Sequence, residues 1–165
     1  MFIVDVIKKE DAEGELKLLY KMIKRSLGFV PAHFELFATI DIEAMKEFAA
    51  YNQKMLMHKS IDKNLLPFLR LEIANRECRE YCVAFNTNMI EKMSSASEVS
   101  VDSKQKVLMS KVLKGIYETK EFGSDDLEEL RKVGFNDKDY FDLLSYATNF
   151  MAKSKMIEVY TSKVS

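Results

Sequence analysis

Residues that shape tight β-turns are scarce in this chain of 165 residues, which has 5 Gly and 2 Pro. An all-β sandwich or barrel needs many such turns and is therefore not expected. The 25 Lys and Arg balance 26 Asp and Glu, so no basic excess exists to neutralise phosphates, and nucleic acid is not an expected partner. No apolar run could cross a membrane, and the N-terminus lacks a signal-peptide pattern. We expect a cytoplasmic protein without a membrane partner.

The hydrophobic content of 47% is enough for a proper core, and apolar residues recur at helical spacing along the chain. These observations predict one all-α domain over residues 1–165. Asp11 is a plausible N-cap of the first helix, which ends at Gly28, and Asp41 caps the third. Pro67 interrupts an apolar helix, which either kinks there or begins its regular part near Asn64.

The second half of the chain has clearer helix signals. Ser124 is predicted to cap a short helix that Gly134 ends, and Asn136 with Asp139 forms a capping box for the last helix. The residues of that last helix predicted to face inward are Phe141, Leu144, Thr148 and Met151. The polar stretch from Ser94 to Glu98 is predicted to be a surface loop.

Cys78 and Cys82 lie four residues apart in what the pattern predicts to be a continuous helix up to Met93. Residues i and i+4 share a helix face with Cα atoms roughly 6 Å apart, which is within disulfide range. A local redox couple is therefore one interpretation. The other is that both are small apolar helix residues, as free cysteines usually are.

Three segments carry a family resemblance: 27–38, with its Leu-Gly-Phe-Val-Pro turn, 60–84, with Tyr81-Cys82 at its end, and 125–139. In this order they resemble the alkylhydroperoxidase D-like (AhpD-like) branch of the carboxymuconolactone decarboxylase family. The resemblance implies an AhpD-like multi-helix bundle that forms a symmetric homo-oligomer, commonly a trimer or hexamer. It also implies thiol-based peroxide or disulfide oxidoreductase activity beside the cysteine helix.

The family's peroxidase members couple Cys-x-x-Cys-x-x-x-His to an upstream Glu. The spacing places both sulfurs on one helix face, with the imidazole beside the second thiol as its base. With the second cysteine aligned on Cys82, Tyr81 stays in register. Arg79 then occupies the first-cysteine position, Asn86 the histidine position and Pro67 the glutamate position. The motif is therefore degenerate.

If the chain is an enzyme, the resemblance makes Cys82 the nucleophile and Cys78 the resolving thiol. Glu72 and Glu77 are candidates for a displaced carboxylate, and Arg79 is a candidate for electrostatic activation of Cys82. The alternative is a non-redox oligomeric scaffold that binds a small molecule or a protein partner. No Gly-rich phosphate loop or paired metal-ligand motif is present, so no cofactor and no metal are expected.

Overall fold

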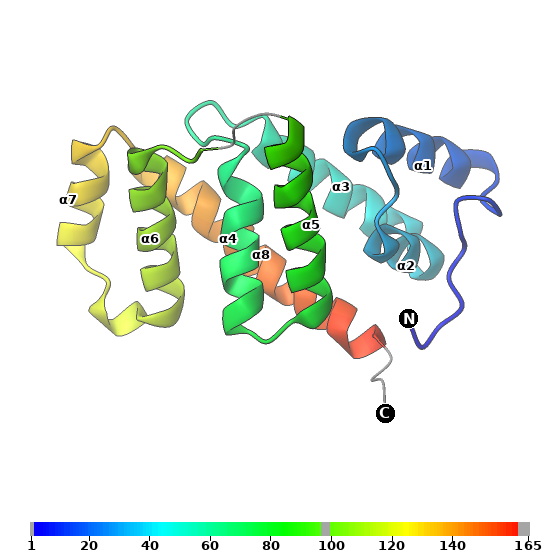
Figure 1. The fold of residues 1–165 in the computed structure, drawn as a ribbon. Helices are drawn as coiled ribbons and strands as arrows, with labels where there is room; N and C mark the ends of the chain where they lie inside the picture. Colours follow the sequence, from blue (N-terminus) through cyan, green and yellow to red (C-terminus); the bar gives the residue numbers. More distant parts are fainter. Residues whose placement is uncertain (1, 97–99, 162–165) are drawn as a thin grey trace. The chain divides into compact units, whose positions relative to one another are not determined.

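The structure, a computed structural model, describes residues 2–96 and 100–161, and this part of the chain is mostly helical (Figure 1). The elements in order are α1 (Gly14–Leu27), α2 (Ala32–Ile40), α3 (Ile42–Leu56), α4 (Leu65–Arg76), α5 (Glu80–Ala96), α6 (Ser103–Tyr117), a 3₁₀ turn η1 (Thr119–Glu121), α7 (Ser124–Lys132) and α8 (Asp137–Tyr160). In the described residues, the only β-pairing is an isolated bridge between Phe2 and Thr161. The predicted all-α fold is confirmed. None of the described helices is long and apolar enough to span a bilayer.

The chain divides into two compact units, residues 1–53 with 156–165, and residues 54–155. The first contains α1, α2 and most of α3. The second contains α4 to α7 and most of α8. Both divisions fall inside helices, α3 and α8, rather than in a linker of the kind that separates domains. The single domain over residues 1–165 stays a prediction.

Helix ends in the first unit follow the sequence signals closely. Gly28 ends α1 with a left-handed backbone, at φ 81°, as predicted. Asp41 caps α3, because its Oδ1 accepts hydrogen bonds from the backbone N–H groups of Glu43 and Ala44, at 3.0 and 3.1 Å. Asp11 does not cap α1, which begins at Gly14. In α2 the residues from His33 to Ala38 are all buried, Phe34 and Phe37 among them.

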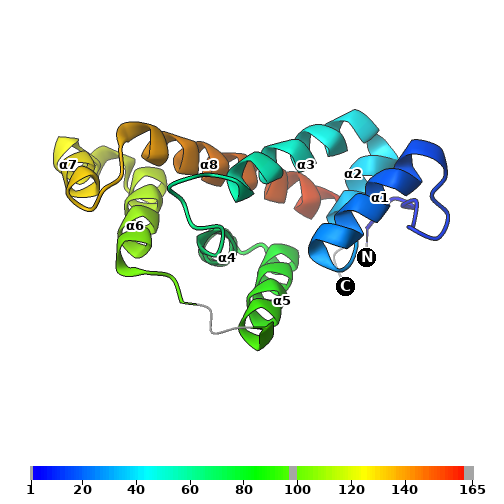
Figure 2. The same cartoon turned by 90° about the horizontal axis from the view of Figure 1, so that it is seen from above.

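Helix α4 is the central helix of the second unit. Figure 2 looks along it from the end, with α5 on one side and α6 on the other. Because neighbours cover it on more than one side, its buried residues do not form a single stripe. They are Leu65, Leu66, Pro67, Leu69, Ile73 and Ala74. The apolar helix predicted around Pro67 is therefore buried on more than one side.

Pro67 does not kink α4, because the helix begins at Leu65. Pro67 is the third helical residue, and in the first turn of a helix the backbone N–H groups have no intrahelical acceptor. Proline therefore costs no hydrogen bond at this position. The second of the two predicted alternatives, a regular helix starting near Asn64, is correct.

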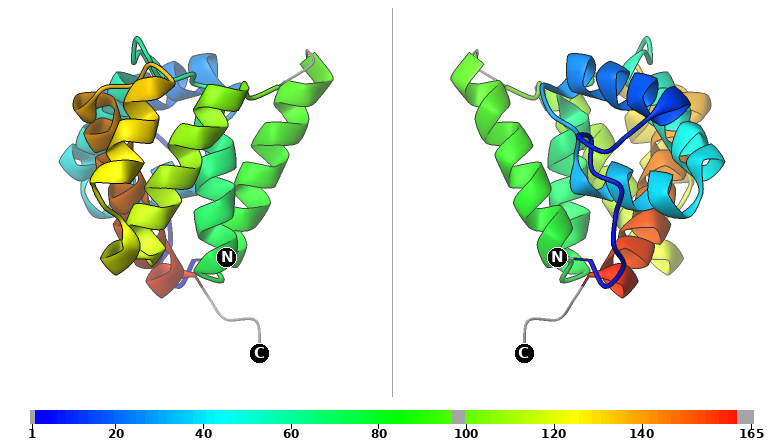
Figure 3. Two further views of the ribbon diagram at one scale, coloured as in Figure 1. Left: turned by 90° about the vertical axis from the view of Figure 1, so that its left-hand side faces the viewer. Right: turned by 90° about the vertical axis from the view of Figure 1, so that its right-hand side faces the viewer.

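The helix predicted to run through Cys78 is instead two antiparallel helices, α4 and α5 (Figure 3). The N–H of Cys78 donates to the carbonyl of Asn75 at 3.2 Å, and the N–H of Arg79 donates to the carbonyl of Ala74 at 2.8 Å. This pair of bonds is a Schellman motif, which needs a left-handed residue at its centre. Cys78 fills that place with φ 53°, where glycine is the usual residue.

The short helix predicted between Ser124 and Gly134 is present as α7, but its N-cap lies one residue earlier than predicted. Gly123, not Ser124, is the N-cap, and its N–H donates to Oδ2 of Asp126 at 3.0 Å. Lys111 and Lys114 also donate to this carboxylate, and together these bonds hold the pKa of Asp126 well below its usual range. Gly134 follows the helix with φ 93°.

The capping box predicted for α8 is present. The N–H of Asn136 donates to Oδ2 of Asp139 at 2.9 Å, and the N–H of Asp139 donates to Oδ1 of Asn136 at 3.0 Å. These two bonds satisfy donors that would be unpaired at the helix start. The start of α8 could therefore be predicted from its sequence alone.

The predicted inner face of α8 is wrong by about one residue. Phe141 is 67% exposed, whereas Leu143 and Ala147 are fully buried and Tyr146 is 3% exposed. Apolar residues occupy neighbouring stripes of this helix, so spacing alone does not distinguish the buried stripe from the exposed one. The predicted loop at Ser94 is also wrong at its start, since α5 continues to Ala96; Ser97 and Glu98 lie outside the described residues.

We expect Cys78→Gly to stabilise the protein. A non-glycine residue in the left-handed region costs about 1 kcal/mol or more, and glycine removes this strain. The measurement is the urea midpoint of unfolding for the wild type and the variant. Gly134→Ala, at the same place in the Schellman motif after α7, should shift the midpoint the opposite way. A Cys78→Gly variant with an unchanged or lower midpoint would contradict the strain argument.

Candidate functional site

Cys82 is the third residue of α5 and is buried, with 3% of its surface exposed. Its place in the first turn favours a thiolate, because the positive end of the helix dipole lies there. Burial acts in the opposite direction, since it disfavours the charged form of a thiol. Cys82, which the resemblance aligns with the family's nucleophile, therefore lies in a favourable place on its helix but is poorly accessible.

Cys78 does not share a helix face with Cys82. It lies in the turn between α4 and α5, it is exposed, and both cysteines are free thiols. The interpretation that placed both sulfurs on one helix is wrong, because the left-handed turn at Cys78 ends α4 before α5 begins. A disulfide between them would have to join an exposed turn to a buried helical side chain.

Asn86, which the resemblance aligns with the family's histidine, is completely buried and has both ends of its amide occupied. Its Nδ2 donates to the backbone carbonyl of Cys82 at 2.8 Å, and its Oδ1 accepts from Nε of Arg70 at 2.8 Å. An amide has no basic site at neutral pH. The structure thus holds position 86 in fixed hydrogen bonds and offers no proton acceptor there.

Arg70 connects this amide to α8. Its Nη1 donates to the hydroxyl of Tyr146 at 2.6 Å, so Arg70, Asn86 and Tyr146 form a polar network across α4, α5 and α8. We call these three residues the Arg70 network. The sequence analysis missed Arg70 and Tyr146. The signal for Arg70 is a single charge inside the apolar run from Leu65 to Leu71, where a side chain needs polar partners.

The predicted carboxylates pair with arginines. Oε1 of Glu72 accepts from Nε of Arg76 at 2.9 Å, one turn away on α4. Oε2 of Glu77 lies 3.4 Å from Nη2 of Arg79. Each of the two candidate carboxylates is thus already paired with an arginine of the same hairpin.

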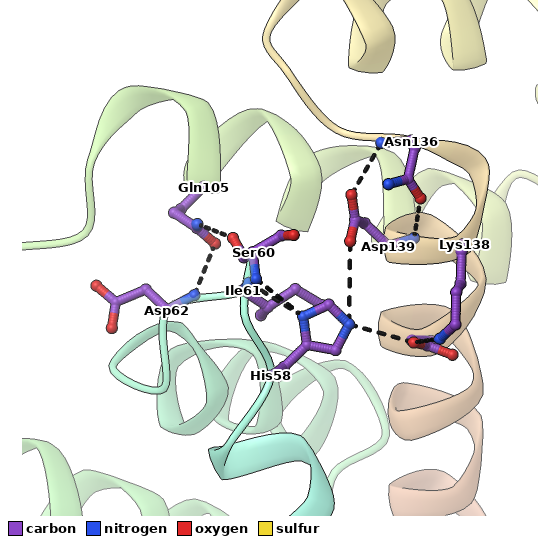
Figure 4. Close-up of polar contacts among 9 residues, drawn as sticks. His58, Ser60, Ile61, Asp62, Gln105, Asn136, Lys138 and Asp139 are labelled. Atoms are coloured by element: carbon purple, nitrogen blue, oxygen red, sulfur yellow. Dashed lines mark hydrogen bonds and ion pairs between the residues drawn. The ribbon is translucent and has the colours of Figure 1, made fainter.

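His58 is held by a second polar cluster, shown in Figure 4. Its Nδ1 accepts from the backbone N–H groups of Ser60 and Ile61, at 3.2 and 3.3 Å, and its Nε2 lies 3.2 Å from Oδ2 of Asp142. The two backbone donors place the ring proton on Nε2, toward the carboxylate. Both ring nitrogens are occupied, so His58 fixes the segment between α3 and α4 rather than serving as an open base.

Metal-ligating side chains do not gather in the described part of the chain, where no group of three His, Cys, Asp or Glu residues could hold an ion. A cavity of about 350 Å³ lies between α4 and α6, and its lining residues are Glu72, Arg76, Met109, Ser110, Leu113, Lys114 and Glu118. A second, of about 390 Å³, lies beside the segment around His58. Neither of these two cavities is lined by Cys82 or Asn86.

The fold is that of AhpD-like peroxidase-related proteins. An uncharacterized peroxidase-related protein from Silicibacter sp. TM1040 has 20% sequence identity and a TM-score of 0.77, over 96% of this chain and 89% of that one. An uncharacterized peroxidase-related protein from Ralstonia eutropha JMP134, described as an alkylhydroperoxidase AhpD core, has 17% identity and a TM-score of 0.76, over 97% and 91%. No model of a known family matches the sequence, and no curated protein matches it. At this identity the likeness shows the fold alone.

We expect the two cysteines to differ sharply in reactivity. Cys78 is exposed and Cys82 is buried, so native protein should take up one equivalent of an alkylating reagent and unfolded protein two. Mass spectrometry of the labelled peptides identifies the site. Cys78→Ser should reduce native labelling to near zero. Labelling of Cys82 before Cys78 in the native protein would contradict the prediction.

Proposed function

We propose that this chain is a non-redox, ligand-binding scaffold on the AhpD-like fold, not an efficient hydroperoxide reductase. The observation that carries the proposal is the state of Asn86. It stands at the position of the family's general base, completely buried, with one hydrogen bond to Arg70 and another to the Cys82 carbonyl. A side chain in this state cannot take a proton from the thiol.

Peroxide reduction by a thiol needs a thiolate, a proton for the leaving oxygen and a second thiol to resolve the sulfenic acid. A positioned acid or base typically contributes about 10²–10⁴-fold to the rate. Here the base position holds an amide, the glutamate position holds Pro67, and the exposed Cys78 is separated from α5 by a turn. Each of the three requirements is weakened separately.

One observation favours the alternative, a thiol-disulfide oxidoreductase that uses Cys82 as nucleophile and Cys78 as resolving thiol. Cys82 lies in the first turn of α5, where the helix dipole stabilises a thiolate. This feature belongs to the fold and would persist after loss of activity. We therefore place it second.

We expect the wild type and Cys82→Ser to consume hydrogen peroxide at the same background rate in the presence of a dithiol reductant. The physical reason is that Asn86, which the resemblance aligns with the family's base, has an amide side chain that cannot take a proton from the thiol. Cys78→Ser serves as a matched control, since it removes the other thiol. A robust wild-type rate that Cys82→Ser abolishes would restore the enzyme hypothesis, with the missing base supplied by Glu72, Glu77 or a neighbouring subunit.

We also propose a homo-oligomer, a trimer or hexamer by resemblance. Apolar side chains on the surface support this. Leu18 and Met22 lie one turn apart on α1 and are 62% and 67% exposed. We expect light scattering at micromolar concentration to give a multiple of 19.1 kDa, and the double substitution Leu18→Ser/Met22→Ser to lower that mass. Lys24→Ser, an exposed change on the same helix, is the control. A monomer mass for the wild type would contradict the proposal.

A further inference from the structure

We propose that the Arg70 network is a binding site for a small oxyanion, a carboxylate or a phosphate. This inference deepens the proposed function and rests on it, since it names the chemical class of ligand that the scaffold would bind. The starting observation is that the network contains one permanent charge and no opposite one. Arg70 is cationic, whereas Asn86 and Tyr146 contribute a neutral amide and a neutral hydroxyl.

The positive charge has no counter-ion in the described part of the chain. Arg70 is half-buried, and none of the carboxylates among residues 2–96 and 100–161 lies within ion-pair distance of it. The other arginines of this hairpin differ, because Arg76 pairs with Glu72 and Arg79 with Glu77. Partial burial of a cation without an opposite charge is unfavourable, and an external anion would relieve this cost.

The guanidinium keeps one nitrogen, Nη2, that the network does not use. Nε and Nη1 are used by Asn86 and Tyr146, but Nη2 has no hydrogen-bond partner in the described residues and is not buried. Nη1 and Nη2 together form the planar edge that binds carboxylate or phosphate through two parallel hydrogen bonds. The Nη2 half of that edge therefore has no partner in the described residues and is left for an oxyanion to bind.

The network also holds the guanidinium in one orientation before any ligand arrives. Two short hydrogen bonds, of 2.8 and 2.6 Å, attach it to α5 and α8. An arginine that is already fixed loses little side-chain freedom on binding, which is a general source of affinity. Partners on two other helices distinguish Arg70 from an ordinary surface arginine, whose charge is solvated and mobile.

The experiment is calorimetric titration of the full chain with sodium acetate and with inorganic phosphate, against sodium chloride at the same ionic strength. We expect saturable binding of one oxyanion per chain and none of chloride. Arg70→Gln should weaken binding at least tenfold. Arg76→Gln, on the same helix but outside the network, should leave binding unchanged. Equal weakening by both variants, or no saturable binding to the wild type, would overturn the proposal.

Two further variants keep the test decisive if Arg70→Gln does not fold. Arg70→Lys retains the charge and loses the planar edge, so it should weaken binding while remaining folded. Asn86→Asp places a carboxylate against Nε of Arg70 and should abolish binding by supplying an internal counter-ion. Unchanged binding in either folded variant would contradict the site.

A second source of the same chemistry is a carboxylate from another copy of the chain. In that case the wild type would bind neither acetate nor phosphate, and Arg70→Gln would lower the mass measured by light scattering. That result would overturn the proposal of a small-molecule site. The peroxide assay is independent of this test, so a failure of oxyanion binding does not alter the conclusion about Cys82, and a robust peroxidase rate does not depend on Arg70.

Discussion

The hydrogen bond between Nε of Arg70 and Oδ1 of Asn86 joins the two helices on which the candidate site is built. Asn86 is completely buried, and a buried amide without partners would cost roughly 1–3 kcal/mol. Its partners are therefore a structural requirement. The amide needs Arg70 on α4 and the Cys82 carbonyl one turn back on α5, and Arg70 in turn needs the hydroxyl of Tyr146 on α8. Through these bonds, Arg70 on α4 connects α5 and α8.

Under the alignment that the resemblance implies, position 86 holds an amide where the family's peroxidase members have a histidine. A histidine at position 86 could serve as a base because one ring nitrogen accepts a proton near neutral pH. An asparagine at this position makes hydrogen bonds of fixed direction and takes no proton. Once an arginine donates to that amide, the position is part of the framework. In this chain that position has a structural use, because Asn86 links α5 to α4.

Much of the fold could be predicted from the sequence because its helix ends carry local signals. Each of these signals acts on backbone groups only a few residues away, so the linear sequence is enough to identify it. The signals are Gly28, Asp41, Gly134 and the pair Asn136 and Asp139. The break at Cys78 could not be predicted in this way, since cysteine is not a typical left-handed residue. There the packing of α5 against α4 overrides local preference.

The candidate site was harder to predict than the fold, for a related reason. Cys78, Cys82 and Asn86 could be selected by comparison with a motif. Arg70, however, lies 16 residues from Asn86 in the sequence, and Tyr146 lies 76 residues from Arg70. Pairings over such separations leave no periodic signal. The buried face of α8 was also predicted wrongly, because apolar residues on neighbouring stripes make Leu143 and Leu144 equivalent in a pattern. Tyr146, the member of the Arg70 network on α8, was missed for the same reason.

The segment between α3 and α4 shows how side chains can replace regular secondary structure. The backbone N–H groups of Ser60 and Ile61 donate to His58, and that of Asp62 donates to Oε1 of Gln105, whose Nε2 donates to the carbonyl of Ser60 (Figure 4). In a helix, each backbone group is satisfied by a neighbour that moves with it. Here the acceptors are a ring tied to Asp142 and an amide on α6. Local opening of this segment therefore has to break hydrogen bonds to side chains of α6 and α8, and not only bonds within the segment itself.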